Sequence, residues 1–218
     1  MAQSLQVDSI YTDFSKAFDK VDHDLLIFKL EKYGIRGKLL EWLKSYLTDR
    51  TQRIKFLNEL SEPIDVTSGV PQGAVLSPLL FKLFNNDLTL LLNGCITSLF
   101  ADDLKLSLII KTLNDTNILQ TTLMILKLWC TRNGAFLNES KCFVISFTRS
   151  NDHIDGGYEI NVTALRRVND IRDLGVILDS KLTFKKQIDK VVASGKTILG
   201  FIKRRARVPR PLLNQTTF

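Results

Sequence analysis

Apolar and polar residues alternate along residues 104–108, where three leucines are separated by one lysine and one serine. A two-residue period is typical of a strand with one buried face. The apolar residues 96–100 favour a second strand just before it. Asp102 and Asp103 therefore lie in the turn of a predicted hairpin, where neighbouring carboxylates repel each other and any burial removes their hydration.

Other segments carry apolar residues three or four positions apart, the spacing of an amphipathic helix. This pattern predicts helices over residues 23–33, 38–47, 115–132 and 184–202. Asp22 is the predicted N-cap of the first helix, and Gly34 ends it. Residues 68–92 begin as a loop rich in glycine and proline and continue as a further helix.

The remaining pattern predicts more strands. They are residues 7–13, 51–57, 62–69 and 141–147, with a further hairpin at 158–178. Strands and helices are mixed, and hairpins recur along the chain. This arrangement indicates the α+β class, an antiparallel sheet layered with helices.

Among the features of composition, the charge distribution indicates a class of partner, because the charges are unevenly distributed along the chain. The 218 residues are 44% hydrophobic and 24% charged, which suits one large globular domain or two small ones. The net charge is +7, and residues 181–210 alone hold ten basic residues and one acidic residue. A nearly neutral body with a strongly basic tail favours an acidic partner, nucleic acid first.

Several classes of protein are excluded at this stage. Cys95, Cys130 and Cys142 are far apart and show no paired spacing, so we expect reduced thiols in an intracellular protein. Two histidines are too few for a histidine-rich metal site. The N-terminus does not resemble a signal peptide, and no apolar run has membrane-spanning length, so we expect no secretion and no membrane partner.

The carboxylates themselves suggest chemistry. Asp13 ends the first predicted strand, and Asp102 and Asp103 lie in the hairpin turn. If these strands are adjacent, three carboxylates meet at one place, where they could hold hard divalent cations. Two metals about 3.5–4 Å apart can support phosphoryl transfer. The alternative is a solvated hairpin turn, because Asp is common in turns.

The surroundings of these residues extend the signal to five blocks in a fixed order. They are YTDFSKAFDKVDHDLL (11–26), SGVPQGAVLSPLLF (68–81), FADD (100–103), WCTRNGAFLNESKC (129–142) and DLGVILDSKLTF (173–184). Together they resemble the reverse transcriptase of non-LTR retrotransposons, especially the jockey-like group of animal elements. The resemblance covers nearly the whole chain.

The resemblance implies a right-hand polymerase fold of the α+β class. Residues 1–165 would form the palm with its connecting helices, 166–180 a primer-grip-like hairpin, and 181–218 the basic start of a helical thumb. The fingers of the family have no counterpart in this sequence, and the thumb match stops at Phe218. We therefore expect a fragment of a larger element.

The resemblance also implies site residues. Asp13, Asp102 and Asp103 match the catalytic acidic cluster, which with the backbone carbonyl of Phe14 would hold two Mg²⁺ ions, with Mn²⁺ as an alternative. Phe18 matches the aromatic residue that excludes a ribose 2′-hydroxyl.

Three further residues match the nucleotide-binding part of the family pattern: Gln72, Gly73 and Lys141. Other interpretations stay open for each of these matches. Phe18 could be a core residue on a turn, the segment around Gln72 and Gly73 a β-turn before a helix, and Lys141 a solvated strand end.

The basic tail would contact the primer–template hybrid through its phosphates. The residues assigned to this contact are Lys181, Lys185, Lys186, Lys190, Lys196, Lys203, Arg204, Arg205 and Arg207. A solvated helix end is an alternative, and residues 203–207 also fit a nuclear localisation signal.

The function implied by the resemblance is RNA-directed DNA polymerisation, with deoxynucleotides, an RNA template and a DNA primer as partners. The alternatives are a catalytically inert nucleic-acid-binding remnant and an unstable product without a role. The expected location is intracellular, in a cytoplasmic ribonucleoprotein, the nucleus or both. The sequence leaves the oligomeric state open.

Overall fold

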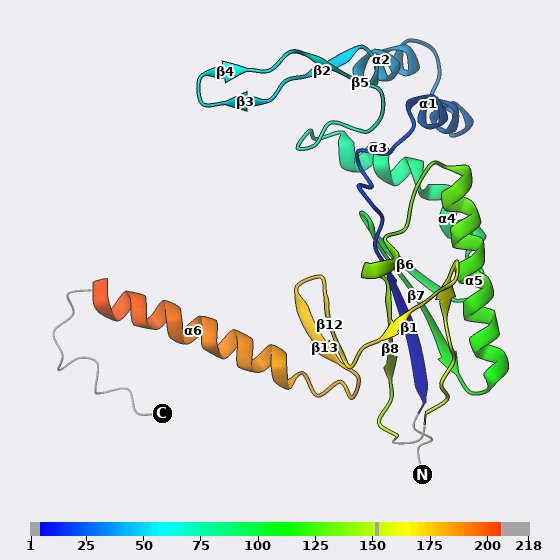
Figure 1. Cartoon of the computed structure of the whole chain (residues 1–218), viewed down its shortest axis with the longest axis vertical. Helices are drawn as coiled ribbons and strands as arrows, with labels where there is room; N and C mark the ends of the chain where they lie inside the picture. Colours follow the sequence, from blue (N-terminus) through cyan, green and yellow to red (C-terminus); the bar gives the residue numbers. More distant parts are fainter. Residues whose placement is uncertain (1–4, 151–152, 206–218) are drawn as a thin grey trace. The chain divides into compact units, whose positions relative to one another are not determined.

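The computed structural model describes residues 5–150 and 153–205. Contacts divide the chain into two compact units, the first ending at Val168 and the second beginning at Asn169. The first unit contains a five-stranded sheet in the order β11-β8-β1-β7-β6 (Figure 1). Its strands are β1 (Gln6–Thr12), β6 (Ile96–Phe100), β7 (Asp103–Ile110), β8 (Phe143–Phe147) and β11 (Arg166–Arg167).

Strand β1 is central because it pairs antiparallel with β7 on one side and with β8 on the other. Ile10 lies opposite Leu106 and Val144, and all three side chains are buried. The alternation predicted around residue 106 is confirmed, since Leu104 is buried as well and Lys105 between them is half-buried.

Helix α5 (Leu113–Arg132) packs against β7 and covers the buried side of the sheet (Figure 1). Leu119, Leu123 and Leu126 are almost fully buried on one face of this helix, as their spacing predicts. Thr112 and Asp115 form a capping box at its start, which satisfies free backbone N–H groups there. The helix predicted over 115–132 is therefore confirmed.

Four shorter helices precede α5. They are α1 (His23–Lys32), α2 (Gly37–Leu47), α3 (Ser77–Phe84) and α4 (Asn86–Leu91). The Asp22 carboxylate accepts a hydrogen bond of 2.8 Å from the backbone N–H of Leu25, which confirms the predicted N-cap of α1. Gly34 follows this helix with φ +92°, a conformation that favours glycine, and its N–H bonds to the carbonyl of Glu31.

A two-stranded ribbon connects α2 to the loop before α3. Strand β2 (Arg50–Gln52) pairs with β5 (Ile64–Val66), and β3 (Lys55–Phe56) pairs with β4 (Glu59–Leu60) further out. Figure 1 shows the ribbon extending away from the helices of the first unit. The sequence predicts two longer strands, over residues 51–57 and 62–69. In the structure each is shorter, because residues 53–54 separate β2 from β3 and residues 61–63 separate β4 from β5.

The single hairpin predicted for 158–178 is wrong. Strands β9 (Glu159–Ile160) and β10 (Thr163–Ala164) form one small hairpin, β11 pairs in parallel with β8, and β12 (Asp170–Asp173) pairs with β13 (Val176–Asp179). Leu174 and Gly175 have φ values of +44° and +91°. They form the turn between β12 and β13, so the apolar run that they begin is only partly a strand.

The second unit contains this β12–β13 hairpin and helix α6 (Lys185–Arg205), where the helical spacing predicted it. Between them, the Asp179 carboxylate accepts hydrogen bonds from the N–H groups of Thr183 and Phe184. The Thr183 N–H, foremost among these donors, lowers the pKa of Asp179. In the part of the chain that the structure describes, no helix combines the length and apolar character needed to cross a membrane.

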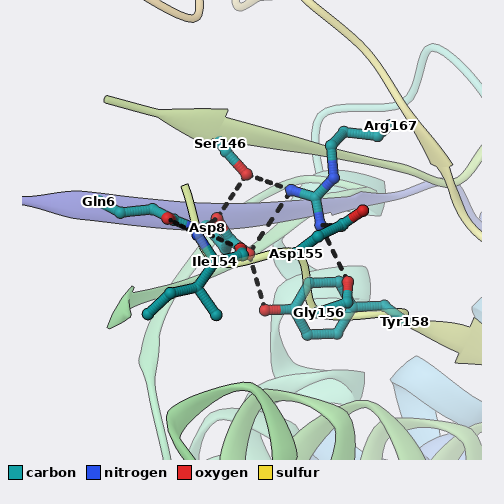
Figure 2. A network of polar contacts seen from close by, with 8 residues as sticks. All are labelled: Gln6, Asp8, Ser146, Ile154, Asp155, Gly156, Tyr158 and Arg167. Carbon is teal, nitrogen blue, oxygen red and sulfur yellow. Dashed lines mark hydrogen bonds and ion pairs between the residues drawn. The ribbon is translucent and has the colours of Figure 1, made fainter. Parts of the chain in front are cut away.

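A buried polar network joins β1 to the segment that leads to β11 (Figure 2). Its centre is Asp8, whose side chain is fully buried. Asp8 accepts hydrogen bonds from Ser146 Oγ at 2.6 Å, Tyr158 Oη at 2.8 Å and Gln6 Nε2 at 2.9 Å. Arg167 Nη1 lies 3.6 Å from the same carboxylate. Four donors thus compensate the lost hydration of one buried charge.

The outer side of the network fixes the chain between β8 and β11. Arg167 donates to the carbonyl of Gly156 at 2.9 Å and pairs with Asp155 at 2.8 Å. Gly156 lies so close to α5 that a Cβ atom there would approach the Thr116 side chain to 2.6 Å. Burial, followed by the nearby Asp8 carboxylate, raises the pKa of Tyr158 and keeps this hydroxyl a donor. The network is therefore a structural anchor of the sheet.

Replacing Asp8 by asparagine should destabilise the first unit strongly, because the substitution leaves buried donors facing an amide. We expect Asp8→Asn to lower the free energy of unfolding by about 3 kcal/mol. Asp155→Asn is the matched control, since Asp155 pairs with the same Arg167 but is exposed, and it should cost less than about 1 kcal/mol. Urea unfolding followed by tryptophan fluorescence measures both, because Trp42 and Trp129 lie in this unit. Equal losses would contradict the role of Asp8.

Candidate active site

The two acidic segments singled out in the sequence meet at one edge of the sheet. Asp13 directly follows β1, and Asp102 lies in the turn between β6 and β7. Strands β1 and β7 are antiparallel neighbours with Thr12 opposite Leu104, so the end of β1 lies beside the start of β7. The Thr12 hydroxyl also donates to the carbonyl of Leu104 at 3.1 Å. The expected placement on adjacent strands is confirmed.

Asp13 and Asp102 line the same hollow, which has a volume of about 330 Å³. Residues from four segments surround it: Asp13, Phe14, Ser15, Lys16, Ala17, Phe18, Asp19, Gln72, Asp102, Asn138 and Lys141. Asp103 begins β7 opposite Phe100 and is not one of these lining residues. The structure therefore brings together two of the three predicted catalytic carboxylates, and the role of Asp103 stays a prediction.

The main chain around Asp13 is held by the segment after α5. The carbonyl of Asp13 accepts a hydrogen bond of 2.8 Å from the N–H of Asn138, and Phe14 forms a β-bridge with Leu137. A short 3₁₀ helix, Glu139–Lys141, follows at once. It places Lys141 Nζ 3.7 Å from Asp13 Oδ2. Both side chains remain accessible, so this ion pair contributes little stability and leaves the ammonium available to an anion.

Phe18 forms an aromatic wall of the hollow. Its ring stacks on Phe81 of α3, with 4.4 Å between the ring centres and 22° between the ring planes. Phe81 is buried, whereas Phe18 is only partly buried and lines the hollow. The two interpretations of Phe18 are therefore compatible, because one face of the ring packs on the core while the residue also borders the hollow.

The loop that carries Gln72 is fastened to the turn after Phe18. The N–H of Val70 donates to the carbonyl of Phe18 at 2.9 Å, and Gln72 Nε2 donates to Asp19 Oδ1 at 2.8 Å. At Gly69, which has φ +86°, a Cβ atom would lie 2.8 Å from the backbone of Asp19. Only glycine allows the two backbones to approach so closely.

Gly73 also has a left-handed conformation, with φ +81°, but its surroundings are open: a Cβ atom there would meet nothing within 4 Å. Its backbone conformation fits the predicted turn. A nucleotide contact at Gly73 stays a prediction.

Two residues on the outer side of this loop were missed in the sequence. His23 Nε2 lies 2.8 Å from the carbonyl oxygen of Gly69, and Arg50 Nη2 donates to the same oxygen at 2.7 Å. Asp19 was also missed, although it lies inside the first of the five blocks. Its neighbour Phe18 matches the family pattern, whereas no periodic pattern in the sequence indicates a contact between residues 19 and 72.

The basic residues of the second unit are solvent-accessible along α6, where no side chain is buried. Lys186 pairs with Asp170 of β12, and the Arg205 guanidinium lies 5.1 Å from the centre of the Phe201 ring. The helix therefore offers cations to a polyanion. Arg207, which was predicted to belong to this set, lies outside the described residues.

The oxygen atoms that line the hollow can be compared with the ligands that metal ions prefer. Within residues 5–150 and 153–205, no group of three or more His, Cys, Asp or Glu side chains is arranged to hold a metal ion. The hollow does contain carboxylate oxygens from two adjacent strands beside the main chain of Phe14. Oxygen donors of this kind suit Mg²⁺ and Mn²⁺.

Comparisons with known sequences identify the family of the chain. The sequence model described as reverse transcriptase (RNA-dependent DNA polymerase) matches residues 9–189. "Probable RNA-directed DNA polymerase from transposon BS" of Drosophila melanogaster is 32% identical over 192 residues, covering 81% of this chain and 20% of that protein. The RNA-directed DNA polymerase from mobile element jockey of Drosophila funebris is 30% identical over 200 residues, covering 87% and 21%. The chain spans about a fifth of the length of these curated relatives.

Solved structures show a shared fold. The apo telomerase of Candida tropicalis, truncated from its C-terminal domain, aligns with a TM-score of 0.56 and 15% identity, covering 83% of this chain and 35% of that one. The telomerase of Candida albicans in complex with a TWJ fragment of telomeric RNA aligns with a TM-score of 0.54 and 15% identity, covering 81% and 31%. The predicted α+β palm fold is confirmed.

The close approach at Gly69 can be tested against Gly73. Both glycines are left-handed, so an alanine costs about 1–2 kcal/mol at either position. Only at position 69 would the new methyl group also collide with backbone, which adds about 1–3 kcal/mol. Gly69→Ala should therefore lower the urea midpoint clearly more than Gly73→Ala. Equal midpoints would show that Gly69 does not lie against the backbone of Asp19.

Proposed function

The chain belongs to the reverse transcriptase (RNA-dependent DNA polymerase) family, and we propose that it supplies the catalytic palm of an RNA-directed DNA polymerase from a non-LTR retrotransposon. The reaction joins a deoxynucleotide to the 3′-hydroxyl of a primer paired with an RNA template. The observation that carries the proposal is the meeting of Asp13 and Asp102 in one hollow, beside Lys141. The relatives named as transposon RNA-directed DNA polymerases support it.

Divalent cations fit the donor set of the hollow. We propose that Asp13 and Asp102, with Asp103 and the carbonyl of Phe14, hold two Mg²⁺ ions, for which Mn²⁺ could substitute. Such ions supply activation of the primer hydroxyl and stabilisation of the departing pyrophosphate. The antiparallel pairing of β1 with β7, which sets Thr12 opposite Leu104, supports this assignment because it brings the two chain segments side by side.

The other lining residues provide binding and orientation. The ammonium of Lys141 would offset negative charge on the triphosphate and on the leaving pyrophosphate. The Phe18 ring, supported by Phe81, would lie under the sugar and leave no space for a 2′-hydroxyl. Gln72 would hydrogen-bond the nucleotide from the opposite loop, with Gly73 allowing its backbone to come close.

Helix α6 is proposed as a contact to the phosphates of the primer–template hybrid. Its accessible lysines and arginines match the negative charge of a nucleic acid, and each neutralised phosphate contributes about −0.7 to −0.9 to the slope of log affinity against log salt concentration. This contact involves no carboxylate of the hollow. Binding without catalysis, as in an inert remnant, is therefore the second candidate.

We also propose an intracellular location, in a cytoplasmic ribonucleoprotein, the nucleus or both. Cys95, Cys130 and Cys142 are free thiols. Burial raises the pKa of Cys130 to about 12, so this thiol stays protonated and unreactive at neutral pH.

Asp102→Asn separates catalysis from binding. An amide is a poor ligand for Mg²⁺, so primer extension on an RNA template should fall more than about a hundredfold. Hybrid binding in the absence of Mg²⁺ should persist with the same salt slope, because the cations of α6 are unchanged. Asp65→Asn, which alters an exposed carboxylate on β5, is the control and should retain extension. Extension by Asp102→Asn at the wild-type rate would rule out the proposed site.

Phe18→Val tests selection of the sugar. The smaller side chain should admit a 2′-hydroxyl and reduce the preference for deoxynucleotides over ribonucleotides by about tenfold or more. Phe56→Val makes the same change at an exposed position of β3 and should leave the preference intact. Single-nucleotide incorporation with each substrate gives the ratio. An unchanged ratio in Phe18→Val would mean that Phe18 only packs against Phe81.

A further inference from the structure

The Asp19 carboxylate and the Gln72 side-chain amide meet at the rim of the hollow. Gln72 Nε2 donates to Asp19 Oδ1 at 2.8 Å, and both residues line the hollow. They belong to two loops, one after β1 and the other before α3. Asp19 directly follows Phe18, the aromatic wall of the hollow.

The chemistry of the contact fixes the orientation of the amide. An ionised carboxylate has only acceptors, so the NH₂ end of Gln72 must face Asp19. The amide oxygen Oε1 then points away from Asp19 and is left as an acceptor. Without this partner, the two ends of the amide could exchange places by rotation about the terminal side-chain bond, whose preferences are broad.

The main chains on both sides of the contact are held in place. The N–H groups of Gly69 and Val70 donate to the carbonyls of Val21 and Phe18 at 2.8 and 2.9 Å. Ser68 Oγ donates to the carbonyl of Asp19 at 2.8 Å. The separation of the Asp19 and Gln72 backbones is therefore set by three hydrogen bonds besides their own.

We propose that Asp19 is a positioning residue, which locks the Gln72 amide so that its oxygen accepts a hydrogen bond from the sugar hydroxyl of the incoming nucleotide. The inference rests on the proposed function for the identity of the ligand. The sugar is the part of the nucleotide assigned to Gln72 because Phe18 is the proposed wall beneath the sugar, and Asp19 directly follows Phe18. A site arranged in this way favours a nucleotide with a 3′-hydroxyl over a 2′,3′-dideoxynucleotide.

The first test needs no activity. In the 218-residue chain, the side-chain amide resonances of Gln72 are identified as the pair lost in Gln72→Glu. Asp19→Asn should shift this pair and speed its hydrogen exchange, because it removes the carboxylate that accepts the hydrogen bond from Gln72 Nε2. Asp24→Asn, an equal change of charge at an exposed position on the first turn of α1, should leave the pair unchanged. A Gln72 pair that does not respond to Asp19→Asn overturns the inference.

The second test measures the consequence for the substrate. With wild type, single-nucleotide incorporation should show a lower KM for the deoxynucleotide than for its dideoxy analogue. The ratio of the dideoxynucleotide KM to the deoxynucleotide KM should fall by about three- to tenfold in Asp19→Asn, the effect of one hydrogen bond. The change in kcat should be smaller. An unchanged KM ratio in Asp19→Asn would overturn the assignment of the sugar hydroxyl.

A double variant distinguishes orientation from loss of charge. Combining Asp19→Asn with Gln72→Glu exchanges the amide and the carboxylate, so the pair can re-form with an acceptor oxygen still facing the hollow. The KM ratio should recover toward wild type, and failure to recover would count against the lock. If wild type extends no primer while the Gln72 resonances respond as expected, the proposed polymerase is rejected but the orientation of Gln72 by Asp19 is supported.

Discussion

Strand β1 is hydrogen-bonded along both edges, and this double pairing brings together the three chain segments that carry Asp13, Asp102 and Lys141. Pairing with β7 sets Asp13 beside the turn that carries Asp102. Pairing with β8 brings the segment before that strand back to the end of β1, so that Asn138 binds the carbonyl of Asp13 and Lys141 comes within reach. A shift of one residue in either register would turn each side chain to the other face of the sheet.

Two aspartates, Asp8 within β1 and Asp13 directly after it, lie in opposite environments. Asp8 is fully buried and surrounded by donors, whereas Asp13 lies at the strand end and opens to the hollow. The difference separates their roles. A buried carboxylate that is hydrogen-bonded to several protein donors is a fixed structural element, and one with accessible oxygens can exchange water for a cation or a substrate.

The parts of the structure that local periodicity determines could be predicted from the sequence. The alternation at Leu104 and Leu106 and the helical spacing of α5 and α6 gave those elements, and the five ordered blocks pointed to Asp13 and Asp102. The contacts of Asp19 with Gln72 and of Asp8 with Tyr158 join residues distant in the chain, and nothing in either segment alone indicates its partner. The turn at Leu174 and Gly175 was missed because an apolar run conceals a left-handed backbone.

Arg50 belongs both to the ribbon and to the loop of Gln72. It is the first residue of β2, and its guanidinium holds the carbonyl of Gly69 while its Nε donates to the carbonyl of Leu47 at 2.8 Å. One side chain therefore links α2 and the ribbon to the loop whose Gln72 lines the hollow. The ribbon is thus attached at its base to the loop that carries Gln72, and removing the Arg50 side chain would remove hydrogen bonds to two carbonyls, in α2 and in that loop, at once.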